Sequence, residues 1–523
     1  MAASACTKTI LDSLSHVDRQ SLLTSPACAS RFHYLNLIHS YYLELNENTT
    51  LTFTLLLVLF PFLFLFLAAI AHRNLAHGMK ILSHRLRLSP TLSAITLIAF
   101  ANGAPDILSS IQSSKLECGN LISLGSLYGA FIFSSTLVIS SVIKVAGTKI
   151  RLPKMAVVKE MVFYALTIVV VFIFGFIGKA GYGLFFTFLI IYVIYALFTV
   201  YIENTEGGIR HTLETFAESE ETERLNKLPI PEEDSSSVEE EYEEEEVGLF
   251  ERIEDRLFDE DSTWIENILT MPLNLIAMVT ISDPSNPLLQ TPLHPFIIVI
   301  SLFFTLSAFK FIELSLSMGL FYGLICLIIL QLAKQVKQLY QSLDILYQVI
   351  GIFAAIGWLK IFTGLVIDCI SFVAFYFTIN HVILATMVLS VGNTVSDLFA
   401  NSSLSRNGEP VMGAMACYSC QLFNNYFGFG MNVLLTVHRG KTFDLFNRFG
   451  TFGRSGTIPL QNIFIIATMI SSFFVIVITM IYLIFYRFTL RQWFSVFLVT
   501  MYLFYFFGSI GYWIYATLTK HHK

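Results

Sequence analysis

Two short polar motifs stand inside strongly apolar parts of the chain, and each contains an asparagine four residues before an aspartate. The first reads Ala-Asn-Gly-Ala-Pro-Asp over residues 101–106, and the second reads Gly-Asn-Thr-Val-Ser-Asp over residues 392–397. In a helix, a spacing of four places both polar side chains on one face. Polar and ionisable residues are costly within a membrane segment, so both motifs are candidate functional sites.

The first motif offers oxygen ligands from side chains and from the backbone. Asn102 supplies an amide and Asp106 a carboxylate. Pro105 removes a backbone donor and Gly103 loosens the turn before it, so we expect freed carbonyl groups there. Such carbonyls are tolerated in a membrane only where the backbone lines a cavity.

The second motif repeats this chemistry with Asn393 and Asp397, and Thr394 and Ser396 add hydroxyl groups. Carboxylate, amide, hydroxyl and carbonyl oxygens form a hard ligand set, which suits Ca²⁺ and Na⁺ rather than copper or zinc. A single intramembrane aspartate can instead cap a helix or join two helices. Two aspartates with matching asparagines favour the ion site over that interpretation.

The two motifs belong to an internal repeat. They lie 291 residues apart, and the match continues downstream, where residues 127–133 correspond to residues 417–423 at a spacing of 290. The first copy begins in the second predicted span and the second copy in the ninth. Seven spans separate the starts of the two copies. Because this number is odd, the copies should face opposite ways in the membrane. Inverted repeats build a midplane site with alternating access in many secondary transporters.

The elements that position these motifs follow from composition. Of 523 residues, 55% are hydrophobic and 13% are charged, and the mean hydropathy is +0.67. Soluble domains carry about 25% charged residues. The apolar stretches are continuous rather than alternating, which excludes a transmembrane β-barrel. We predict an all-α polytopic membrane protein of about twelve transmembrane helices, with two inverted five-helix repeats.

The predicted spans fall into groups of five, two and five. They cover residues 51–71, 92–113, 120–144, 160–178 and 181–202; 294–309 and 313–333; and 345–375, 379–404, 411–437, 460–486 and 491–517. The predicted domains are an outer N-terminal segment (1–50), a first repeat (51–202), an acidic inner loop with an interfacial segment (203–290), two linking helices (291–340), a second repeat (341–518) and a C-terminal tail (519–523).

Basic residues predict the orientation. In the first half, nine lysines and arginines between residues 73 and 159 fall on one side of the membrane, and only Lys115 and Lys179 fall on the other. The positive-inside rule makes the first side cytoplasmic or matrix and places the N-terminus outside. The basic loop at 439–454 falls outside and conflicts with this rule. A mitochondrial inner membrane and a plasma membrane or endomembrane both stay open.

The motifs resemble those of the Ca²⁺/cation antiporter superfamily, in particular its cation/Ca²⁺ exchanger branch, which includes the mitochondrial Na⁺/Ca²⁺ (Li⁺-permeant) exchanger. That branch reads Gly-Asn-Gly-Ala-Pro-Asp in its first repeat, where this chain has Ala101 in the leading position. Its second repeat reads Gly-Asn-Ser-x-Gly-Asp, where this chain has Thr394 and Ser396. Phe423-Asn424, followed by Gly428 and Gly430, is similar to a further motif of the branch.

The resemblance implies a secondary antiporter that exchanges Ca²⁺ for a monovalent cation, with Na⁺ or Li⁺ favoured and K⁺ or H⁺ as alternatives. Asp106 and Asp397 would bind the ion from opposite halves in equivalent roles, and Asn102 and Asn393 would complete the site. Where the superfamily often has a further ligand motif, only Gln421 offers a side-chain oxygen. The expected partners are these cations and the lipid bilayer. No cofactor, nucleic-acid partner or enzymatic activity is expected.

Two other functions stay open at this point. One is a structural subunit that keeps the exchanger fold without transport. The other, more remote, is an intramembrane aspartic protease using Asp106 and Asp397 as a dyad. Lys360 and Asp368 are eight residues apart in one span, where a lysine reaching the interface is favoured over an ion pair. Cys417 and Cys420 are interpreted as helix-packing residues.

Overall fold

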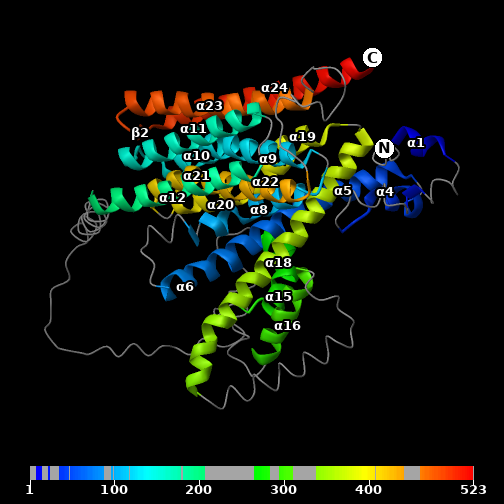
Figure 1. The fold of residues 1–523 in the computed structure, drawn as a ribbon, viewed down its shortest axis with the longest axis horizontal. Coiled ribbons are helices and arrows are strands. Elements are labelled where there is room, and N and C mark those ends of the chain that lie inside the picture. Colours follow the sequence, from blue (N-terminus) through cyan, green and yellow to red (C-terminus); the bar gives the residue numbers. More distant parts are fainter. Residues whose placement is uncertain are drawn as a thin grey trace.

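The computed structural model describes residues 8–14, 22–23, 34–45, 47–86, 96–97, 99–116, 118–177, 181–205, 264–282, 294–309, 337–377, 379–406, 408–440 and 460–521. The predicted span at 313–333 and the acidic segment at 206–262 lie outside these residues. Nearly all of the described chain is helical, and Figure 1 shows most of the helices as one bundle of long elements. The predicted class, an all-α membrane protein, is therefore confirmed.

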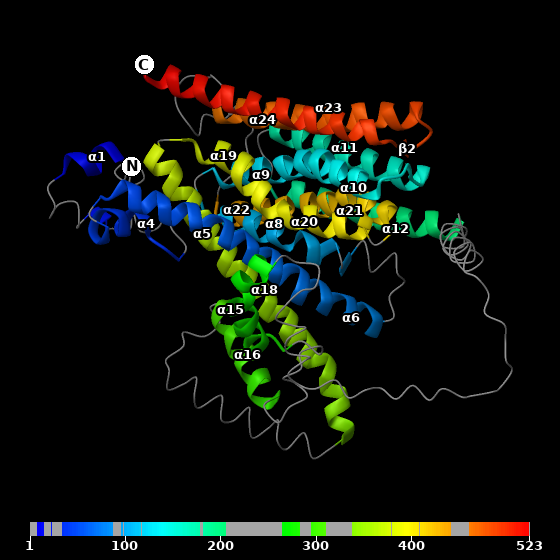
Figure 2. The same ribbon diagram turned by 180° about the vertical axis from the view of Figure 1, so that it is seen from behind.

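Long helices lie side by side along the bundle in both views (Figures 1 and 2). One of them is continuous and consists of α9 (Gly119–Phe133), η5 (Ser134–Val138) and α10 (Ile139–Ala146). The others are α11 (Lys154–Ile177), α12 (Tyr182–Thr205), α23 (Leu460–Phe485) and α24 (Gln492–His521). Their outward side chains are apolar, as with Leu197, Phe485 and Phe504, which are 66%, 79% and 85% exposed. An exposed apolar surface of this kind suits contact with lipid.

The two motif helices lie in the interior of the bundle. The first motif is on α8 (Ala99–Ser113) and the second on α20 (Ser390–Arg406). α20 follows α19 (His381–Leu384) and the π-helical η7 (Ala385–Leu389), and α8 and α20 contact each other. The next helix of the second half consists of α21 (Pro410–Phe423), η8 (Asn424–Phe429) and α22 (Gly430–His438).

Two long elements cross this bundle obliquely in both figures. One consists of α5 (Thr49–Ala69), η3 (Ile70–Ala76) and α6 (His77–Arg85), and the other is α18 (Lys337–Phe377). Both pack on the motif helices, since α18 contacts α8 and α5 contacts α20. Gly392 of the second motif permits this approach, because a Cβ atom there would come within 2.0 Å of the Phe64 ring.

A smaller group of helices packs beside the N-terminal half of α18. It contains α15 (Trp264–Thr280) and α16 (His294–Ala308). The Ser282 hydroxyl donates to the Tyr347 carbonyl oxygen at 2.8 Å, and the Trp358 ring stacks on Phe304 at 4.6 Å. α16 forms where the span at 294–309 is predicted, and α15 occupies the predicted interfacial segment. On the outer side of α5, the N-terminal segment forms α1 (Lys8–Ser13), α4 (Leu37–His39) and the π-helical η2 (Ser40–Glu44).

Two short strands join the halves of the chain. β1 (Ile150–Arg151), between α10 and α11, pairs antiparallel with β2 (Thr489–Leu490), between α23 and α24. The two turns therefore lie at the same end of the bundle. The predicted topology requires this, because three and eleven spans precede them and an even number lies between.

Seven helices in the described part of the chain are long and apolar enough to cross a membrane, and the bent pair 381–395 and 397–406 would make an eighth. The helices α8, α16 and α21–η8–α22 also lie at the predicted spans 92–113, 294–309 and 411–437, and α8 is described from Ala99 onward. The two halves share a local feature: a π-helical stretch begins directly after Phe133 and directly after Phe423. These matching positions agree with the predicted repeat. π-helical turns are also frequent at functional sites.

Candidate functional site

Asp106 occupies the centre of the site, where its side chain is 3% exposed. The Asn424 side chain donates from Nδ2 to Asp106 Oδ2 at 2.9 Å. Asn393 makes a further side-chain hydrogen bond to the same carboxylate. One aspartate from the first motif is thus held by an amide from the second motif and by another from η8. These contacts join the two halves of the chain at a single carboxyl group.

Asn393 also links the motif helices to each other. Its Nδ2 donates to Ser109 Oγ at 3.0 Å, and that hydroxyl donates to the Asp106 carbonyl oxygen at 2.9 Å. The asparagine of the second motif thus reaches across to α8 rather than staying beside Asp397. The amide is oriented by Ser109, which stabilises its contact with the carboxylate.

Asp397, on α20, is 7% exposed and interacts electrostatically with Asp106. The structure thus brings the two predicted acids into the same neighbourhood. Cys417 and Cys420 of α21 are buried neighbours of Asp397. Asp397 forms no hydrogen bond with the residues that the structure describes, so the two acids have different surroundings despite their matching positions in the motifs.

The remaining predicted ligands differ in their burial and in their hydrogen bonds. Asn102 is only partly buried and makes no hydrogen bond within the described ranges. Thr394 is fully buried, and its hydroxyl donates to the Ser390 carbonyl oxygen at 2.7 Å. Gln421 is fully buried, and neither polar atom of its amide has a partner in the described part of the chain. The Ser396 side chain lies outside the described residues.

Gly103 acts through its lack of a side chain. A Cβ atom at this position would come within 1.8 Å of Asn424 Oδ1, so only glycine lets the Asn424 amide lie against α8. α8 stays helical through Gly103 and Pro105. Since proline has no N–H, the carbonyl group of Ala101 loses its usual donor four residues later. Gly103 therefore has a packing role, and the freed carbonyl belongs to Ala101.

Two residues of this site, Asn424 and Ser109, were not among the predicted ligands. Asn424 is the second residue of the Phe-Asn motif that resembles the exchanger branch, so the sequence did contain a signal for it. It is also the first residue of η8, where the change from α- to π-helix turns successive side chains differently. Nothing in the spacing of residues indicated Ser109.

Two oxygen atoms of the site are left for a ligand by the described part of the chain. Asp106 Oδ1 and Asn424 Oδ1 are buried and have no hydrogen-bond partner among the described residues. Buried polar atoms are normally satisfied, so unpartnered ones call for a ligand. Within the same residues, no group of three histidine, cysteine, aspartate or glutamate side chains is placed to hold a metal ion. An ion here would therefore take carboxylate and neutral oxygens, as Ca²⁺ and Na⁺ do.

Lys360 and Asp368 have different partners in the structure. Lys360 Nζ donates to the Ala308 carbonyl oxygen at 2.7 Å and lies 4.9 Å from the Phe309 ring centroid. Asp368 Oδ2 accepts the backbone N–H groups of Tyr34 and Leu35 at 2.8 and 3.0 Å. Asp368 thus fixes the N-terminal segment to α18.

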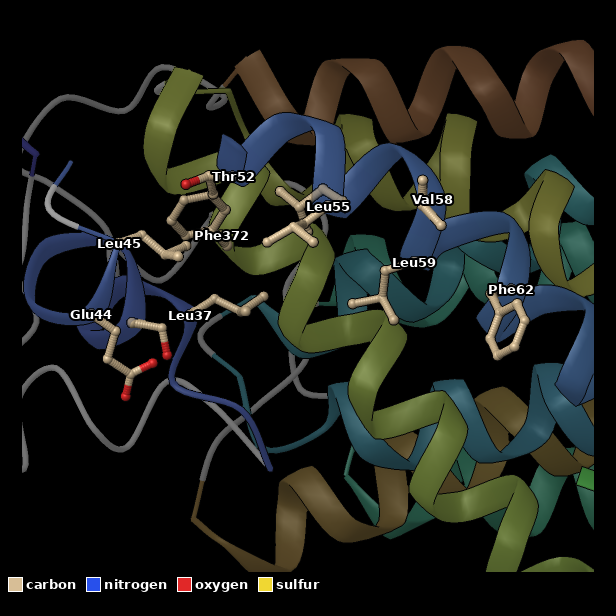
Figure 3. Close-up of a pocket in the computed structure, with 11 residues that line it drawn as sticks. Leu37, Glu44, Leu45, Thr52, Leu55, Val58, Leu59, Phe62 and Phe372 are labelled. Carbon is tan, nitrogen blue, oxygen red and sulfur yellow. The ribbon is translucent and has the colours of Figure 1, made fainter. Parts of the chain in front are cut away.

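A pocket of about 500 Å³ lies away from the acids, between α4–η2, α5 and α18 (Figure 3). Leu37, Leu55, Val58, Leu59 and Phe62 line it, with Glu44 at its edge. Its lining is mostly apolar and contains none of the motif residues. We therefore assign the candidate ion site to α8, α20 and η8 and not to this pocket.

A family model described as sodium/calcium exchanger protein matches residues 40–201 and 347–511 of the chain. These ranges contain both motifs and η8. The putative sodium/calcium exchanger 6 of Caenorhabditis elegans is 24% identical over 422 residues, which cover 70% of this chain and 68% of that protein. The cation/calcium exchanger 5 of Arabidopsis thaliana is 23% identical, covering 68% of this chain and 65% of its own length.

The human mitochondrial sodium/calcium exchanger protein is 23% identical over 406 residues, covering 70% of this chain and 67% of that protein. The chain thus spans about two thirds of the length of these relatives. Among solved structures, the H⁺/Ca²⁺ exchanger CAX is 11% identical, with 92% of each chain covered and a TM-score of 0.45. The sodium–calcium exchanger NCX_Mj is 12% identical, with 85% and 95% covered and a TM-score of 0.34.

Proposed function

The chain belongs to the sodium/calcium exchanger protein family, and from this premise we propose that it is a secondary antiporter exchanging Ca²⁺ for a monovalent cation across a membrane. Na⁺ or Li⁺ is the favoured counter-ion, and K⁺ and H⁺ are the alternatives. Relatives named as sodium/calcium and cation/calcium exchangers support the Ca²⁺ side of this exchange.

The observation that carries the proposal is the arrangement around Asp106. Its carboxylate is buried, is hydrogen-bonded by Asn424 and Asn393, and keeps Oδ1 without a partner in the described residues. Asp397 adds a second carboxylate within electrostatic range. Two acids compensate the dehydration of a divalent cation, and the amide oxygens of Asn393 and Asn424 complete a hard oxygen set.

Alternating access would use the two oblique elements. α18 packs on α8, and α5 packs on α20, so movement of α5 and α18 over the motif helices would change which side of the membrane reaches the acids. This scheme rests on the inverted repeat, which the parity of the predicted spans and the matching π-helical stretches support. Asp106 and Asp397 would then receive the ion from opposite halves of the chain.

The intramembrane protease hypothesis is not retained, because the family is one of transporters. The contacts agree with this, since the Asp106 carboxylate is bound by two asparagines and not by Asp397. The hypothesis of a structural subunit without transport activity is decided by the flux experiment below.

The test is Ca²⁺ uptake by the purified full-length chain in proteoliposomes under imposed gradients of Na⁺, Li⁺, K⁺ or H⁺. We expect uptake that depends on an outward Na⁺ or Li⁺ gradient and that Asp106→Asn abolishes. Equal uptake in protein-free liposomes, or none under any gradient at equal folded protein, would contradict the proposal and favour the structural subunit.

A further inference from the structure

The pocket between η2, α5 and α18 is apolar along most of its length and polar at one end. Its apolar part is lined from α5 and α18, by Leu55, Leu56, Val58, Leu59, Phe62 and Phe372. Its polar end is formed by η2, with the Ser40 hydroxyl and the Glu44 carboxylate. Glu44 and Phe62 lie at opposite ends of the lining (Figure 3). This distribution suits a ligand with one long apolar part and one polar group.

The apolar part of the pocket follows α5 through half of a predicted membrane span. Between Thr52 and Phe62, which both line the pocket, α5 advances about 15 Å at the helical rise of about 1.5 Å per residue. One leaflet of a bilayer has a hydrocarbon layer of about 15 Å, which is half of the whole core. The predicted span begins at residue 51, at its predicted outer end. The pocket therefore has the depth of an acyl chain in the outer leaflet.

The α5 wall of the pocket belongs to a surface that faces lipid. Leu55 and Val58 line the pocket and are still 51% and 65% exposed, and the neighbouring Leu57 is 76% exposed. Apolar side chains with this exposure, on a helix long enough to cross a membrane, are expected to contact the bilayer. A lipid tail can therefore enter the pocket directly from the membrane.

The polar end carries acceptors that the protein leaves open. The Glu44 side chain is 64% exposed, and its ion-pair contact with His39 Nδ1 is 3.9 Å long, too far for a hydrogen bond. The Ser40 hydroxyl makes no hydrogen bond within the described ranges. Glu47, just beyond η2, is also exposed and adds acidic charge. A carboxylate beside a hydroxyl is complementary to an ammonium group, which brings a positive charge and three N–H donors.

The two walls of the pocket belong to different oblique elements. η2 is attached to α18, because the Tyr41 ring lies 5.7 Å from the ring centroids of both Phe372 and Tyr376. The opposite wall is α5, which packs on the motif helix α20. A ligand in the pocket therefore lies between α5 and a platform fixed on α18.

We propose that this pocket binds one phospholipid with a primary ammonium headgroup, phosphatidylethanolamine, from the outer leaflet. One acyl chain lies along α5 as far as Phe62, and the ammonium group donates to Glu44 and Ser40. A choline headgroup has no N–H donor and a glycerol headgroup has no positive charge, so neither reproduces these contacts. The proposal concerns lipid binding, and it holds whichever cations the chain exchanges.

The first test locates the acyl chain. The full-length chain is reconstituted with phosphatidylethanolamine that carries a photoreactive diazirine in its acyl chain, and mass spectrometry identifies the labelled peptides after illumination. Val58→Trp places a large ring in the pocket. Leu57→Trp is the matched control, because Leu57 is an adjacent, exposed residue of α5 that does not line the pocket.

We expect labelling of the peptides that contain η2 and the first half of α5. Overfilling a binding pocket costs about 1–3 kcal/mol, so Val58→Trp should lower this labelling about fivefold or more, whereas Leu57→Trp should leave it unchanged. Equal labelling in both variants would overturn the proposal, since the tail would then be ordinary surrounding lipid. Absence of labelling in the wild type would also overturn it, and another part of this chain or a second copy would then fill the pocket.

The second test concerns the headgroup and needs no ion flux. Unlabelled phosphatidylethanolamine should compete with the photoreactive lipid more strongly than phosphatidylcholine or phosphatidylglycerol with the same acyl chains. Glu44→Gln should weaken its competition about tenfold, the effect of one charge-assisted hydrogen bond, and Glu47→Gln is the control of equal charge change. Equal competition by the three lipids, or a preference that Glu44→Gln leaves intact, would refute the headgroup site. Melting temperatures of all variants in detergent verify that equal folded amounts are compared.

Discussion

Asn424 is the residue on which the geometry of the candidate site depends, because it connects η8 to the carboxylate of Asp106. Its amide fits against α8 only because Gly103 has no side chain. The two acids also differ in their hydrogen bonds. Asp106 has two amide partners, and Asp397 has no hydrogen bond with the described residues. The sequence predicted equivalent roles from the repeat, whereas these contacts predict different ones.

Gly103→Ala should displace Asn424 from Asp106. The added methyl group would come within 1.8 Å of Asn424 Oδ1, so the amide must rotate away. We expect Ca²⁺ affinity, measured by isothermal titration on purified protein, to fall about tenfold, the effect of one lost contact to a charged ligand group. Gly430→Ala is the control, since its Cβ would meet Phe185 and Phe188 at 3.5 and 3.6 Å. Equal affinities in both variants would exclude this role of Gly103.

Asp106→Asn and Asp397→Asn should both lose Ca²⁺ transport but should differ in stability. Asp106→Asn weakens two hydrogen bonds, and we expect it to lower the free energy of unfolding by about 1–3 kcal/mol. Asp397→Asn removes one of two neighbouring acids without losing a hydrogen bond to a described residue, so stability should stay equal or rise. Thermal unfolding in detergent without Ca²⁺ distinguishes the variants, and identical shifts would favour the equivalence that the repeat predicts.

At the scale of elements, a buried ion pair on α11 is hydrogen-bonded to two residues of α12. Lys159 Nζ lies 3.1 Å from Glu160 Oε1, and their side chains are 6% and 3% exposed. The Tyr195 hydroxyl donates to the same oxygen at 2.8 Å, and Lys159 donates to Thr199 Oγ1 at 2.8 Å. These contacts fix the relative position of the two helices, and α11 also carries Tyr164.

Glu160→Gln should destabilise the protein strongly, because it leaves the Lys159 ammonium group buried beside a neutral amide. Breaking a buried pair on one side costs about 3–5 kcal/mol. The double variant Lys159→Met, Glu160→Gln should recover much of this loss. Thermal unfolding of the three proteins checks the prediction. If Glu160→Gln unfolds at the wild-type temperature, the pair does not hold the helices together.

The attachment of the N-terminal segment to α18 also depends on one side chain. Asp368 accepts the N–H groups of Tyr34 and Leu35, and a Cβ at Gly364 would come within 2.3 Å of the Tyr34 ring. In Asp368→Ala, the amide hydrogens of Tyr34 and Leu35 should exchange with solvent faster, because their acceptor is lost. Mass spectrometry of the N-terminal peptide measures this, and slow exchange unchanged from the wild type would contradict the anchoring role.

At the scale of the whole molecule, the β1–β2 pairing sets the topology. It places the turn between α10 and α11 and the turn between α23 and α24 at one end of the bundle. The sequence predicts that the segment after α22 lies on the opposite side of the membrane, although its basic residues would favour the inner side.

Single cysteines at Lys149 and Arg487 should therefore react with a membrane-impermeant maleimide from the same side. A cysteine at Arg439 should react from the opposite side, because an odd number of predicted spans separates it from the other two. Labelling of sealed vesicles before and after permeabilisation measures the sidedness, with the wild-type chain as background. Labelling of all three positions from one side would mean that the predicted span count in the second half is wrong.

The order of residues alone was sufficient to predict a helical membrane protein, its two motifs and its family. Hydropathy and helical spacing are local properties, so they can be read without knowing which helices meet. For the same reason, Asp106, Asp397 and Asn393 were predicted as site residues, since an acid or amide in an apolar segment is conspicuous by itself.

Only the tertiary structure decided which side chains meet. Asn424 and Asp106 are 318 residues apart, and their contact depends on the packing of η8 against α8 and on the small size of Gly103. The same packing leaves Asn102 only partly buried. It also gives Asp106 a hydrogen bond from Asn424, whereas Asp397 has none with the described residues. It also places the Asn425 amide on the Tyr164 hydroxyl, and the Tyr164 ring edge to face with Tyr128. No local pattern predicts these contacts, because they form only where helices from distant parts of the chain pack together.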